Sequence, residues 1–311
     1  MSRLPADNFS LGHSLGCGQV FGWKQQEEWW HGVIGEKPVK IRQEFVPLSS
    51  SEYSLLPAKF RVSSSSSFLE YYGVSQRELE QYFSLDHDFE FIQPLITSSG
   101  RDEILAKAVS LFSGLRLIRQ NPWECAVSFI CSANANIPRI EKMLQNLRQR
   151  FGTRLEPAFP SDFAHYSFPT PQKLAKATEK ELRGCNLGFR AGYVKEFAKA
   201  VASKKLDFAE ISQLPFSVAR QNLIEQKGIG EKVADCILLF SLGHYEAFPV
   251  DVWIRRAVTC LYKDELKQFA GKKKISDDLI RSFAASKWNG FAGYAQQFLY
   301  LYARENRNCL V

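Results

Sequence analysis

Closely spaced cysteine pairs are missing from this sequence, and histidine is scarce. Its seven cysteines are scattered, no two of them are separated by two residues, and there are only five histidines. Structural zinc sites and cysteine-ligated iron–sulfur sites are normally built from such close pairs. We therefore expect no metal and no cofactor. An odd number of dispersed cysteines also favours reduced thiols in an intracellular compartment over a disulfide framework.

Long apolar runs are missing as well. No uncharged apolar run reaches the roughly 18 residues that suggest a membrane span, and the N-terminus MSRLPADNFS lacks the apolar centre of a signal peptide. We expect no membrane association and no clear targeting segment. The protein should be intracellular, and nuclear if its source is eukaryotic. With 45% hydrophobic and 13% aromatic residues, it should pack as a globular protein. We expect a monomer.

Negative charge is in deficit. Lysine and arginine total 40 against 33 acidic residues, which gives a formal net charge of +7 and a pI near 9.0. This balance favours a polyanionic partner, although many basic proteins bind no nucleic acid. At 311 residues the chain is long enough for two or three lobes rather than one small module.

The N-terminal part alternates aromatic or β-branched residues with polar ones between Gly18 and about Phe45, which predicts antiparallel strands. The serine run Ser63–Ser67 predicts a flexible loop. A helix should follow over residues 75–83, with Ser75 as its cap and Glu78 as the capping-box partner.

Helical periods dominate beyond about residue 88. Pro at the first helical turn marks two of the starts, at Asn121-Pro122 and Thr170-Pro171. The predicted helices cover residues 102–112, 122–132, 137–151, 171–178, 179–185, 191–202, 217–225 and 231–242. These patterns predict an α+β protein with an N-terminal antiparallel sheet lobe (1–90) and a two-part helical body (91–311). One half of the body should span 115–205, and the other should combine 91–114 with 206–311.

A Gly-rich turn separates the last two of these predicted helices. Gly228 and Gly230 permit a tight hairpin, and the amides at the start of the second helix would hold a DNA phosphate without reading a base. The spacing of two glycines is equally compatible with an ordinary helix–turn–helix connection.

Lys232 and Asp251 both stand at predicted helix starts, 19 residues apart in the sequence. The positive end of the helix dipole disfavours an ammonium at Lys232, and partial burial acts in the same direction, which is how a lysine becomes a nucleophile near neutral pH. By themselves, such a lysine is more often a surface residue and such an aspartate a simple N-cap. If the two helix starts converge, they place an amine and a carboxylate in one cleft.

The segment KGIGEKVADCILLFSLGHYEAFPVDVW resembles the helix-hairpin-helix and Gly/Pro-Asp signature of the DNA glycosylase superfamily. Further segments narrow the resemblance to the eukaryotic-type 8-oxoguanine DNA glycosylase/AP lyase. They are SLGCGQVFGW, GLRLIRQNPWECAVSFICSANANIPRIEKM, LGFRAGYV and GFAGYAQQFLY, which follow the family order over most of the chain. The resemblance implies double-stranded DNA containing 8-oxoguanine opposite cytosine as the partner.

The resemblance implies a role for several single residues. Lys232 would attack the sugar C1′ of an extruded nucleotide and form a Schiff base that permits β-elimination, and Asp251 would stabilise the positive charge on the sugar in its ionised form, which its helix position favours. The backbone carbonyl of Gly18 would accept the N7–H that guanine lacks. Gln296 would read the Watson–Crick edge of the base.

Other matching positions hold the base and its former partner. Tyr300 and Cys236 match the residues that sandwich the base. Their alternative reading is helix packing, and that of Gly18 is a simple turn. The DNA-facing matches are Asn134, which fills the vacated space, Arg139 and Arg190, which contact the orphaned cytosine, and the wedge Phe189.

The chain departs from the family pattern at several positions. Trp253 replaces a histidine, so an imidazole contact cannot carry over. Phe189 lacks the hydroxyl of the family's wedge tyrosine, and Tyr300 adds a hydroxyl where the family has phenylalanine. Ala133 and Ala135 change the hydrogen bonds of an Asn-rich loop.

Three alternatives have distinguishing features. An iron–sulfur endonuclease or adenine glycosylase would need a C-terminal cysteine cluster, which is missing. An alkylbase glycosylase would lack the lysine. A non-enzymatic helix-hairpin-helix DNA-binding protein would carry Lys232 and Asp251 only as a surface charge and a cap, and would form no covalent adduct with DNA.

Overall fold

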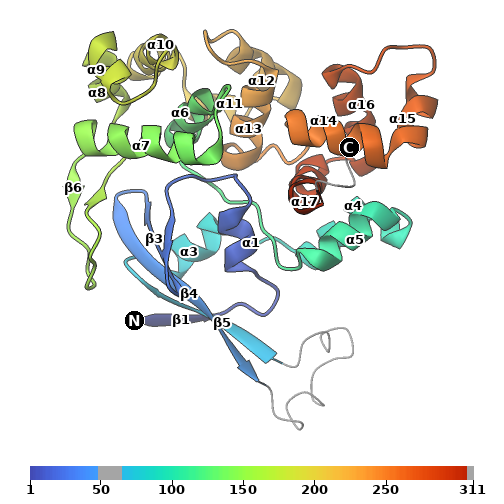
Figure 1. The fold of residues 1–311 in the computed structure, drawn as a ribbon, viewed down its shortest axis with the longest axis horizontal. Coiled ribbons are helices and arrows are strands. Elements are labelled where there is room, and N and C mark those ends of the chain that lie inside the picture. The colour runs from blue at the N-terminus through green and yellow to red at the C-terminus, as the bar shows by residue number, and fades with distance from the viewer. Residues whose placement is uncertain (48–64, 307–311) are drawn as a thin grey trace.

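The computed structural model describes residues 1–47 and 65–306. In this part of the chain a sheet lobe lies beside a larger helical body (Figure 1). Helix α7 (Ile137–Phe151) crosses above the sheet in this view, and the short strands β6 (Arg154–Leu155) and β7 (His165–Tyr166) extend beside it. The predicted α+β class is confirmed.

The sheet has five strands with antiparallel neighbours in the order β1-β5-β4-β3-β2. The strands are β1 (Ser2–Pro5), β2 (Lys24–Gln26), β3 (Trp29–Ile34), β4 (Lys37–Pro47) and β5 (Ser65–Tyr72). Ile41 of β4 is paired with Tyr71 of β5, and both side chains are buried. Because side chains alternate along a strand, one face of the sheet becomes apolar, and α1 (Leu11–Gly16) and α3 (Gln76–Tyr82) share its core.

The prediction of a loop for Ser63–Ser67 is wrong for its last three residues, which begin β5; the first two lie outside the described residues. Pairing with β1 and β4 stabilises this strand despite its weak sequence pattern. The Ser67 amide donates to Asp7 Oδ1 at 2.8 Å, and its hydroxyl donates to the Ala6 carbonyl. Serine can therefore lie in this strand because its backbone and hydroxyl groups find partners.

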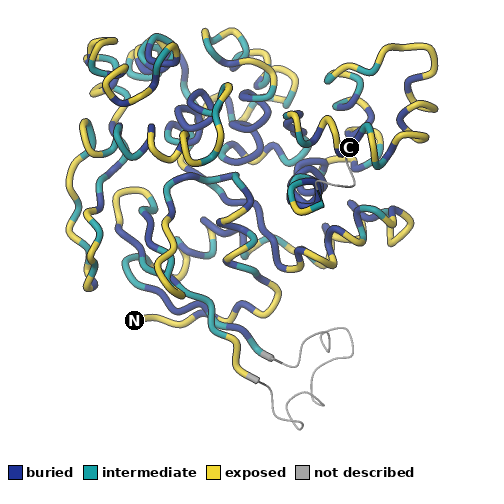
Figure 2. The backbone as a smooth tube through the Cα atoms, in the orientation of Figure 1, coloured by how far each residue is buried: buried dark blue, intermediate teal, exposed yellow. Residues whose placement is uncertain are grey.

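The helical body surrounds one large core. Most residues of α13 and α17 are buried in it (Figure 2). Helix α13 packs on α6, α10 on α8, and α14 on α17. Besides α7, the elements are α4 (Phe89–Ile96), the 3-10 helix η2 (Ser98–Gly100), α5 (Glu103–Leu111), α6 (Pro122–Ser132), α8 (Pro171–Lys176), α9 (Glu179–Gly184), α10 (Arg190–Ala202), α11 (Phe208–Ile211), α12 (Phe216–Ile224), α13 (Glu231–Ser241), α14 (Val252–Leu261), α15 (Lys263–Ala270), α16 (Asp277–Trp288) and α17 (Ala292–Glu305).

The capping signals in the sequence correspond to observed helix starts. Ser75 and Glu78 form both hydrogen bonds of a capping box. The predictions at Asn121-Pro122 and Thr170-Pro171 are confirmed, because Asn121 Oδ1 and Thr170 Oγ1 accept amides of the first helical turn at 3.2 and 3.3 Å. Among the helices of residues 1–47 and 65–306, none is long and apolar enough to span a bilayer.

Candidate active site and DNA-contacting loops

The hairpin between α12 and α13 depends on two glycines with different surroundings. Gly228 has φ +92°, and a Cβ there would lie 2.5 Å from Cβ of Tyr193, so only glycine fits. Gly230 is the N-cap of α13, and a Cβ there would meet nothing within 4 Å. The start of α13 is therefore open to an approaching anion.

Lys232 is the second residue of α13 and is half-buried. Its ammonium donates to Ser132 Oγ at 3.3 Å and lies 4.8 Å from the ring centroid of Phe129. Both neighbours belong to α6, so the packing of α13 on α6 fixes the amine. The predicted surface alternative does not describe this environment.

Asp251 is the N-cap of α14, and its Oδ1 accepts the Ile254 amide at 2.8 Å. The positive charge of Lys232 lowers the pKa of the Asp251 carboxyl, so the two helix starts lie near each other. Burial raises the pKa of Asp251, and it outweighs the backbone hydrogen bonds and the Lys232 charge, which lower it. The hydrogen bonds at the helix start favour the ionised form of Asp251, as predicted, whereas burial, which the sequence did not indicate, opposes it.

Gly18 and Tyr300 meet beside this pair. Gly18 has φ +78°, and a Cβ there would lie 3.2 Å from Tyr300 Oη and 3.3 Å from Ile137 Cδ1. Burial, followed by the charge of Asp251, raises the pKa of Tyr300 to about 12, so the phenol stays protonated. Next to Gly18, the Cys17 carbonyl accepts a hydrogen bond from Gln297 Nε2 at 3.1 Å, which ties the N-terminal segment to α17.

Gln296 and Cys236 are buried close to the same centre. The amide nitrogen of Gln296 donates to the Pro249 carbonyl at 3.2 Å, whereas its buried Oε1 has no hydrogen-bond partner within the described ranges. An unpartnered buried acceptor is costly unless a ligand donates to it. Burial raises the pKa of the Cys236 thiol to about 12, so this cysteine is an apolar wall rather than a nucleophile.

The predicted DNA-facing residues lie on two neighbouring loops and in the first turns of the helices that follow them. Asn134 is exposed with φ +50°, and Arg139 is exposed in the first turn of α7. Phe189 is 50% exposed. Arg190 is only 1% exposed, and its guanidinium donates to the carbonyls of Ala133 (2.9 Å) and Asn134 (3.3 Å). Arg190 therefore holds the Asn134 loop in place, and contact with a base would require it to leave these carbonyls.

Several contributors to the site were not predicted. Ser132, Phe129, Cys17 and Gln297 contact or tie together the predicted residues. A signal existed for Ser132, Cys17 and Gln297, which adjoin the Asn-rich loop, Gly18 and Gln296 in the sequence, and none existed for Phe129. Trp253 is half-buried in the first turn of α14, with Arg256 Cζ 6.0 Å from its ring centroid.

A glycine hairpin, a half-buried lysine amine near a carboxylate, and a buried glutamine oxygen without a partner among the described residues are the features of a DNA base-excision enzyme of the helix-hairpin-helix class. Residues 2–126 match the 8-oxoguanine DNA glycosylase N-terminal domain, and residues 127–282 match the HhH-GPD superfamily of base excision DNA repair proteins. The chain belongs to this superfamily, as a member of its 8-oxoguanine DNA glycosylase/lyase family. The resemblance seen in the sequence is thereby confirmed.

Similar proteins span bacteria, archaea and yeast. A probable N-glycosylase/DNA lyase of Methanothermobacter thermautotrophicus is 27% identical over 98% of this chain and 96% of its own length. The N-glycosylase/DNA lyase of Saccharomyces cerevisiae is 33% identical over 71% and 65%. A crystal structure of Clostridium acetobutylicum 8-oxoguanine glycosylase/lyase, in complex with double-stranded DNA containing cytosine opposite 8-oxoG, superposes with TM-score 0.79 at 33% identity over 96% and 93%.

Proposed function

We propose that this protein removes 8-oxoguanine paired with cytosine from duplex DNA and then cleaves the strand by β-elimination. The observation that supports the chemistry is that Lys232 and Asp251 stand at two helix starts and act electrostatically on each other, while the buried Oε1 of Gln296 lacks a partner among the described residues. The Clostridium relative binds DNA with the same lesion pair.

In this reaction the Lys232 amine forms a bond to C1′ of the extruded nucleotide, and the bond from C1′ to the base breaks with the electron pair leaving on the base. Loss of an amine proton and opening of the sugar give a Schiff base, whose C2′ proton is then acidic enough for β-elimination of the 3′ phosphate. Ionised Asp251 stabilises the positive sugar. Its packing near Lys232 makes that stabilisation available without reorganisation.

Base selection is assigned to the pocket beside this pair. The carbonyl of Gly18 accepts the N7–H that distinguishes the oxidised base, and Gln296 Oε1 accepts from its Watson–Crick edge. Cys236 and Tyr300 are assigned to the two faces of the base. A buried site that leaves polar groups unpaired with guanine discriminates strongly against it.

Recognition of the opposite strand is assigned to the two loops. Asn134 fills the space left by the base, Phe189 wedges beside it, and Arg139 contacts the cytosine. Arg190 is proposed to act on the cytosine as well as on the loop, and its hydrogen bonds to the carbonyls of Ala133 and Asn134 support the second role more directly. Gly228 and Gly230 shape the hairpin that holds a phosphate, so affinity should fall steeply with salt.

The proposal is tested by excision from matched duplexes that carry 8-oxoguanine, an adenine mispair or an alkylated base, with each opposite base varied. We expect cleavage of the 8-oxoguanine–cytosine duplex above all others. Borohydride should trap a covalent adduct between the wild-type protein and the DNA, and none with Lys232→Gln. The control Lys227→Gln removes a neighbouring lysine and should still form the adduct. If the wild-type protein forms no adduct, the proposed lyase function is wrong and the non-enzymatic alternative is favoured.

Other assignments belong with this proposal. We place the enzyme inside the cell, in the nucleus if its source is eukaryotic, as a monomer with duplex DNA as its partner and no metal or cofactor. We divide the chain into a lobe of residues 1–90 and a helical body of two halves, 115–205 and 91–114 with 206–311. The DNA cleft is proposed to lie between those two halves. The free cysteines of the described chain agree with a reducing compartment.

A further inference from the structure

Three consecutive lysines, Lys272–Lys274, stand in the loop between α15 and α16, at the upper right of Figure 1. All three are exposed (Figure 2). Gly271 ends α15 with φ +57°, a conformation that favours glycine, and the Lys273 amide donates to the Ala270 carbonyl at 3.0 Å. A defined turn therefore presents three ammonium groups to solvent. We call it the lysine loop.

The acidic residues that follow the lysine loop already have cationic partners. Asp277 forms an ion pair with Arg255 of α14, and Asp278 forms one with Arg281 of α16 at 2.8 Å. Within residues 1–47 and 65–306, by contrast, none of Lys272–Lys274 forms an ion pair. Three neighbouring like charges repel one another, and a polyanion bound to the loop would relieve that repulsion.

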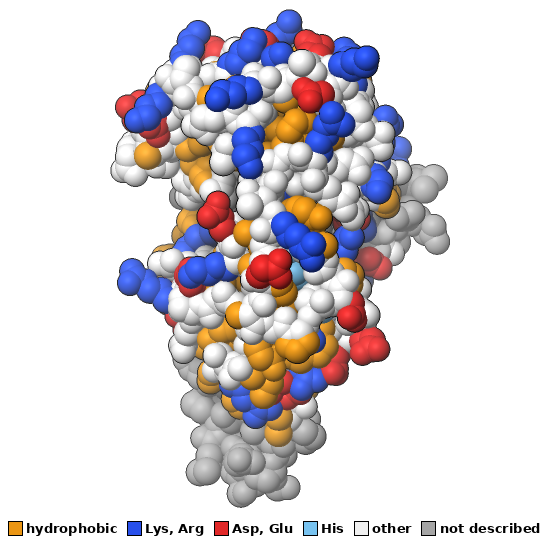
Figure 3. All heavy atoms as spheres, turned by 90° about the vertical axis from the view of Figure 1, so that its left-hand side faces the viewer, with side chains coloured by type: hydrophobic (Ala, Val, Ile, Leu, Met, Phe, Trp, Pro, Cys, Tyr) orange, Lys and Arg blue, Asp and Glu red, His pale blue; other side chains and the backbone are white. Residues whose placement is uncertain are grey.

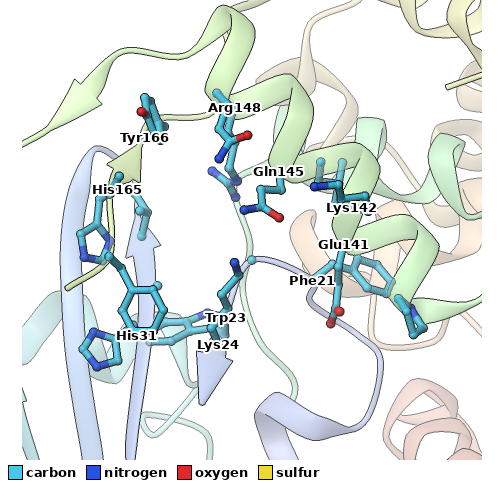
Figure 4. Close-up of a pocket in the computed structure, with 18 residues that line it drawn as sticks. Phe21, Trp23, Lys24, His31, Glu141, Lys142, Gln145, Arg148, His165 and Tyr166 are labelled. Atoms are coloured by element: carbon cyan, nitrogen blue, oxygen red, sulfur yellow. The ribbon is translucent and has the colours of Figure 1, made fainter. Parts of the chain in front are cut away.

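Two other regions with basic side chains differ from the lysine loop. On the face seen in Figure 3, the lysines and arginines over the helices are interspersed with acidic side chains. Arg148 of α7 points toward Lys24 across a cavity beside the sheet (Figure 4), but it forms an ion pair with Glu124 and its side chain is only 11% exposed. The lysine loop is both accessible and without a counter-charge in the described chain.

Helix α16, which the lysine loop enters, contacts the first residues of both helices that carry the proposed reaction. Arg281 of α16 forms an ion pair with Glu231, the first residue of α13. Asp277, the first residue of α16, pairs with Arg255, the fourth residue of α14. The start of α16 therefore lies beside the starts of α13 and α14.

The distance from the lysine loop to these helix starts is short. Lys274 precedes Asp277 by three residues, which extend at most about 11 Å. Phosphates advance about 3.4 Å per base pair along each DNA strand, so a few base pairs cover such a distance. A duplex with its lesion at Lys232 and Asp251 therefore has backbone within reach of the loop.

We propose that the lysine loop binds the sugar–phosphate backbone of duplex DNA on one side of the lesion. The contacted phosphates lie outside the nucleotides assigned to the active site and to the Asn134 and Phe189 loops. This inference rests on the proposed function for the place of the DNA, and it adds a contact surface to it. Lysine acts on a phosphate as a point charge and reads no base, so the loop strengthens binding to any sequence.

Fluorescence anisotropy of the full chain tests the lysine loop. The probe is a labelled duplex of about 25 base pairs, long enough to include both flanks of the site. It carries a tetrahydrofuran abasic analogue opposite cytosine, so there is no base to excise. Lys272→Gln/Lys273→Gln/Lys274→Gln should bind about ten-fold or more weakly near 0.1 M salt. The slope of log affinity against log salt should become shallower by about 2 to 3, because each phosphate contact contributes about 0.9.

The matched control is Lys199→Gln/Lys204→Gln/Lys205→Gln, which changes the net charge equally. These exposed lysines lie in the last turn of α10 and just after it, roughly 15–20 Å along the helix axis from Phe189. At that separation salt screens their effect on DNA, so the affinity should stay within about two-fold of wild type. All six lysines are exposed, so both variants should fold, which thermal melting verifies.

Methylphosphonate replacement of single phosphates locates the contact, because it removes one charge at a time. Neutral phosphates on one side of the lesion should weaken binding by the wild-type protein and leave binding by the lysine-loop variant unchanged. The proposal is overturned if that variant keeps the wild-type affinity and slope, as it would if the loop served an acidic protein segment. It is also overturned if the control weakens equally, or if no phosphate distinguishes the two proteins.

Excision separates this inference from the proposed function. With protein in saturating excess, the lysine-loop variant should remove 8-oxoguanine opposite cytosine at the wild-type single-turnover rate. A wild-type protein without excision activity would contradict the proposed function, while the anisotropy measurements, which need no excision, would still decide the role of the loop.

Discussion

Asp251 has two roles that a single substitution separates. Its Oδ1 caps α14, and its charge acts on Lys232. Asparagine keeps the cap, so Asp251→Asn should bind lesion DNA normally and lose about 100-fold or more in single-turnover excision rate, as when other groups that stabilise transition-state charge are removed. Normal excision by this variant would contradict the assigned role.

The pH dependence of excision offers a second prediction about the same residue. Because burial raises the pKa of Asp251, wild type should lose activity as the pH falls through that raised pKa and the carboxyl becomes protonated. Activity should return as the pH rises and the ionised form is restored. Single-turnover rates measured across pH give this loss of activity on the acidic side of the profile. It should be absent in Asp251→Asn.

Gly18 is constrained by both its backbone and its neighbours. Alanine there would adopt φ +78° and approach Tyr300 Oη and Ile137 Cδ1 to 3.2 and 3.3 Å. Strain of this kind costs roughly 1–3 kcal/mol, so Gly18→Ala should lower the excision rate by about ten-fold or more. Gly16→Ala is the matched control, because a Cβ at Gly16 meets nothing within 4 Å. Equal rates for both variants would refute a role for Gly18 at the pocket.

At the scale of elements, Arg190 at the start of α10 holds the loop after α6. Arg190→Ala would leave the carbonyls of Ala133 and Asn134 without these donors, at a cost of about 1–3 kcal/mol. We expect a lower melting temperature together with a weaker preference for cytosine opposite the lesion. Arg183→Ala, at an exposed ion pair, should change neither. An unchanged melting temperature for Arg190→Ala would show that the loop does not depend on it.

The elements differ in how far local sequence determines them. Helices α6 and α7 begin and end where the periodicity predicted, because capping and apolar spacing are local signals. Strand β1 was not predicted, and β5 was partly taken for a loop. Their pairing, as of Leu4 with Leu69, joins residues far apart in the chain and leaves little trace in either segment.

The catalytic centre followed the same division. Lys232 and Asp251 were proposed from spacing and helix starts, whereas Gly18 and Gln296 were proposed only through the family resemblance. The orientation of Arg190 into the protein was not predictable, because no local pattern indicates whether an arginine faces a loop carbonyl or a DNA base.

At the scale of the whole molecule, Asp235 joins the hairpin to α16. Its carboxylate pairs with Arg220 of α12 at 2.6 Å and with Arg281 of α16 at 3.7 Å. Burial nevertheless raises the pKa of Asp235 from 3.8 to about 6. Between these two values the native state retains the proton and the unfolded chain releases it, so stability should fall as the pH rises through this window.

The predicted contribution of Asp235 is about 3 kcal/mol between pH 4 and 6, from a shift of about two pKa units. Free energies of unfolding in urea across this range measure it. Asp235→Asn should remove this part of the pH dependence, and Asp264→Asn, at an exposed position on α15, should keep it. Parallel pH profiles for wild type and Asp235→Asn would rule out this coupling.

The hydrogen bond from Gln297 to the Cys17 carbonyl joins residues 280 positions apart. During synthesis, Gly18 emerges from the ribosome long before Gln297 is added. Nearly the whole chain must therefore be made before the proposed base pocket can close. A nascent chain, or one cut by a protease after α16, carries the hairpin and Lys232 without Gln296, Gln297 or Tyr300. Such a fragment keeps Lys232 and Gly18 but lacks the α17 side chains that are proposed to complete the base pocket, so we expect lesion specificity to require the finished polypeptide.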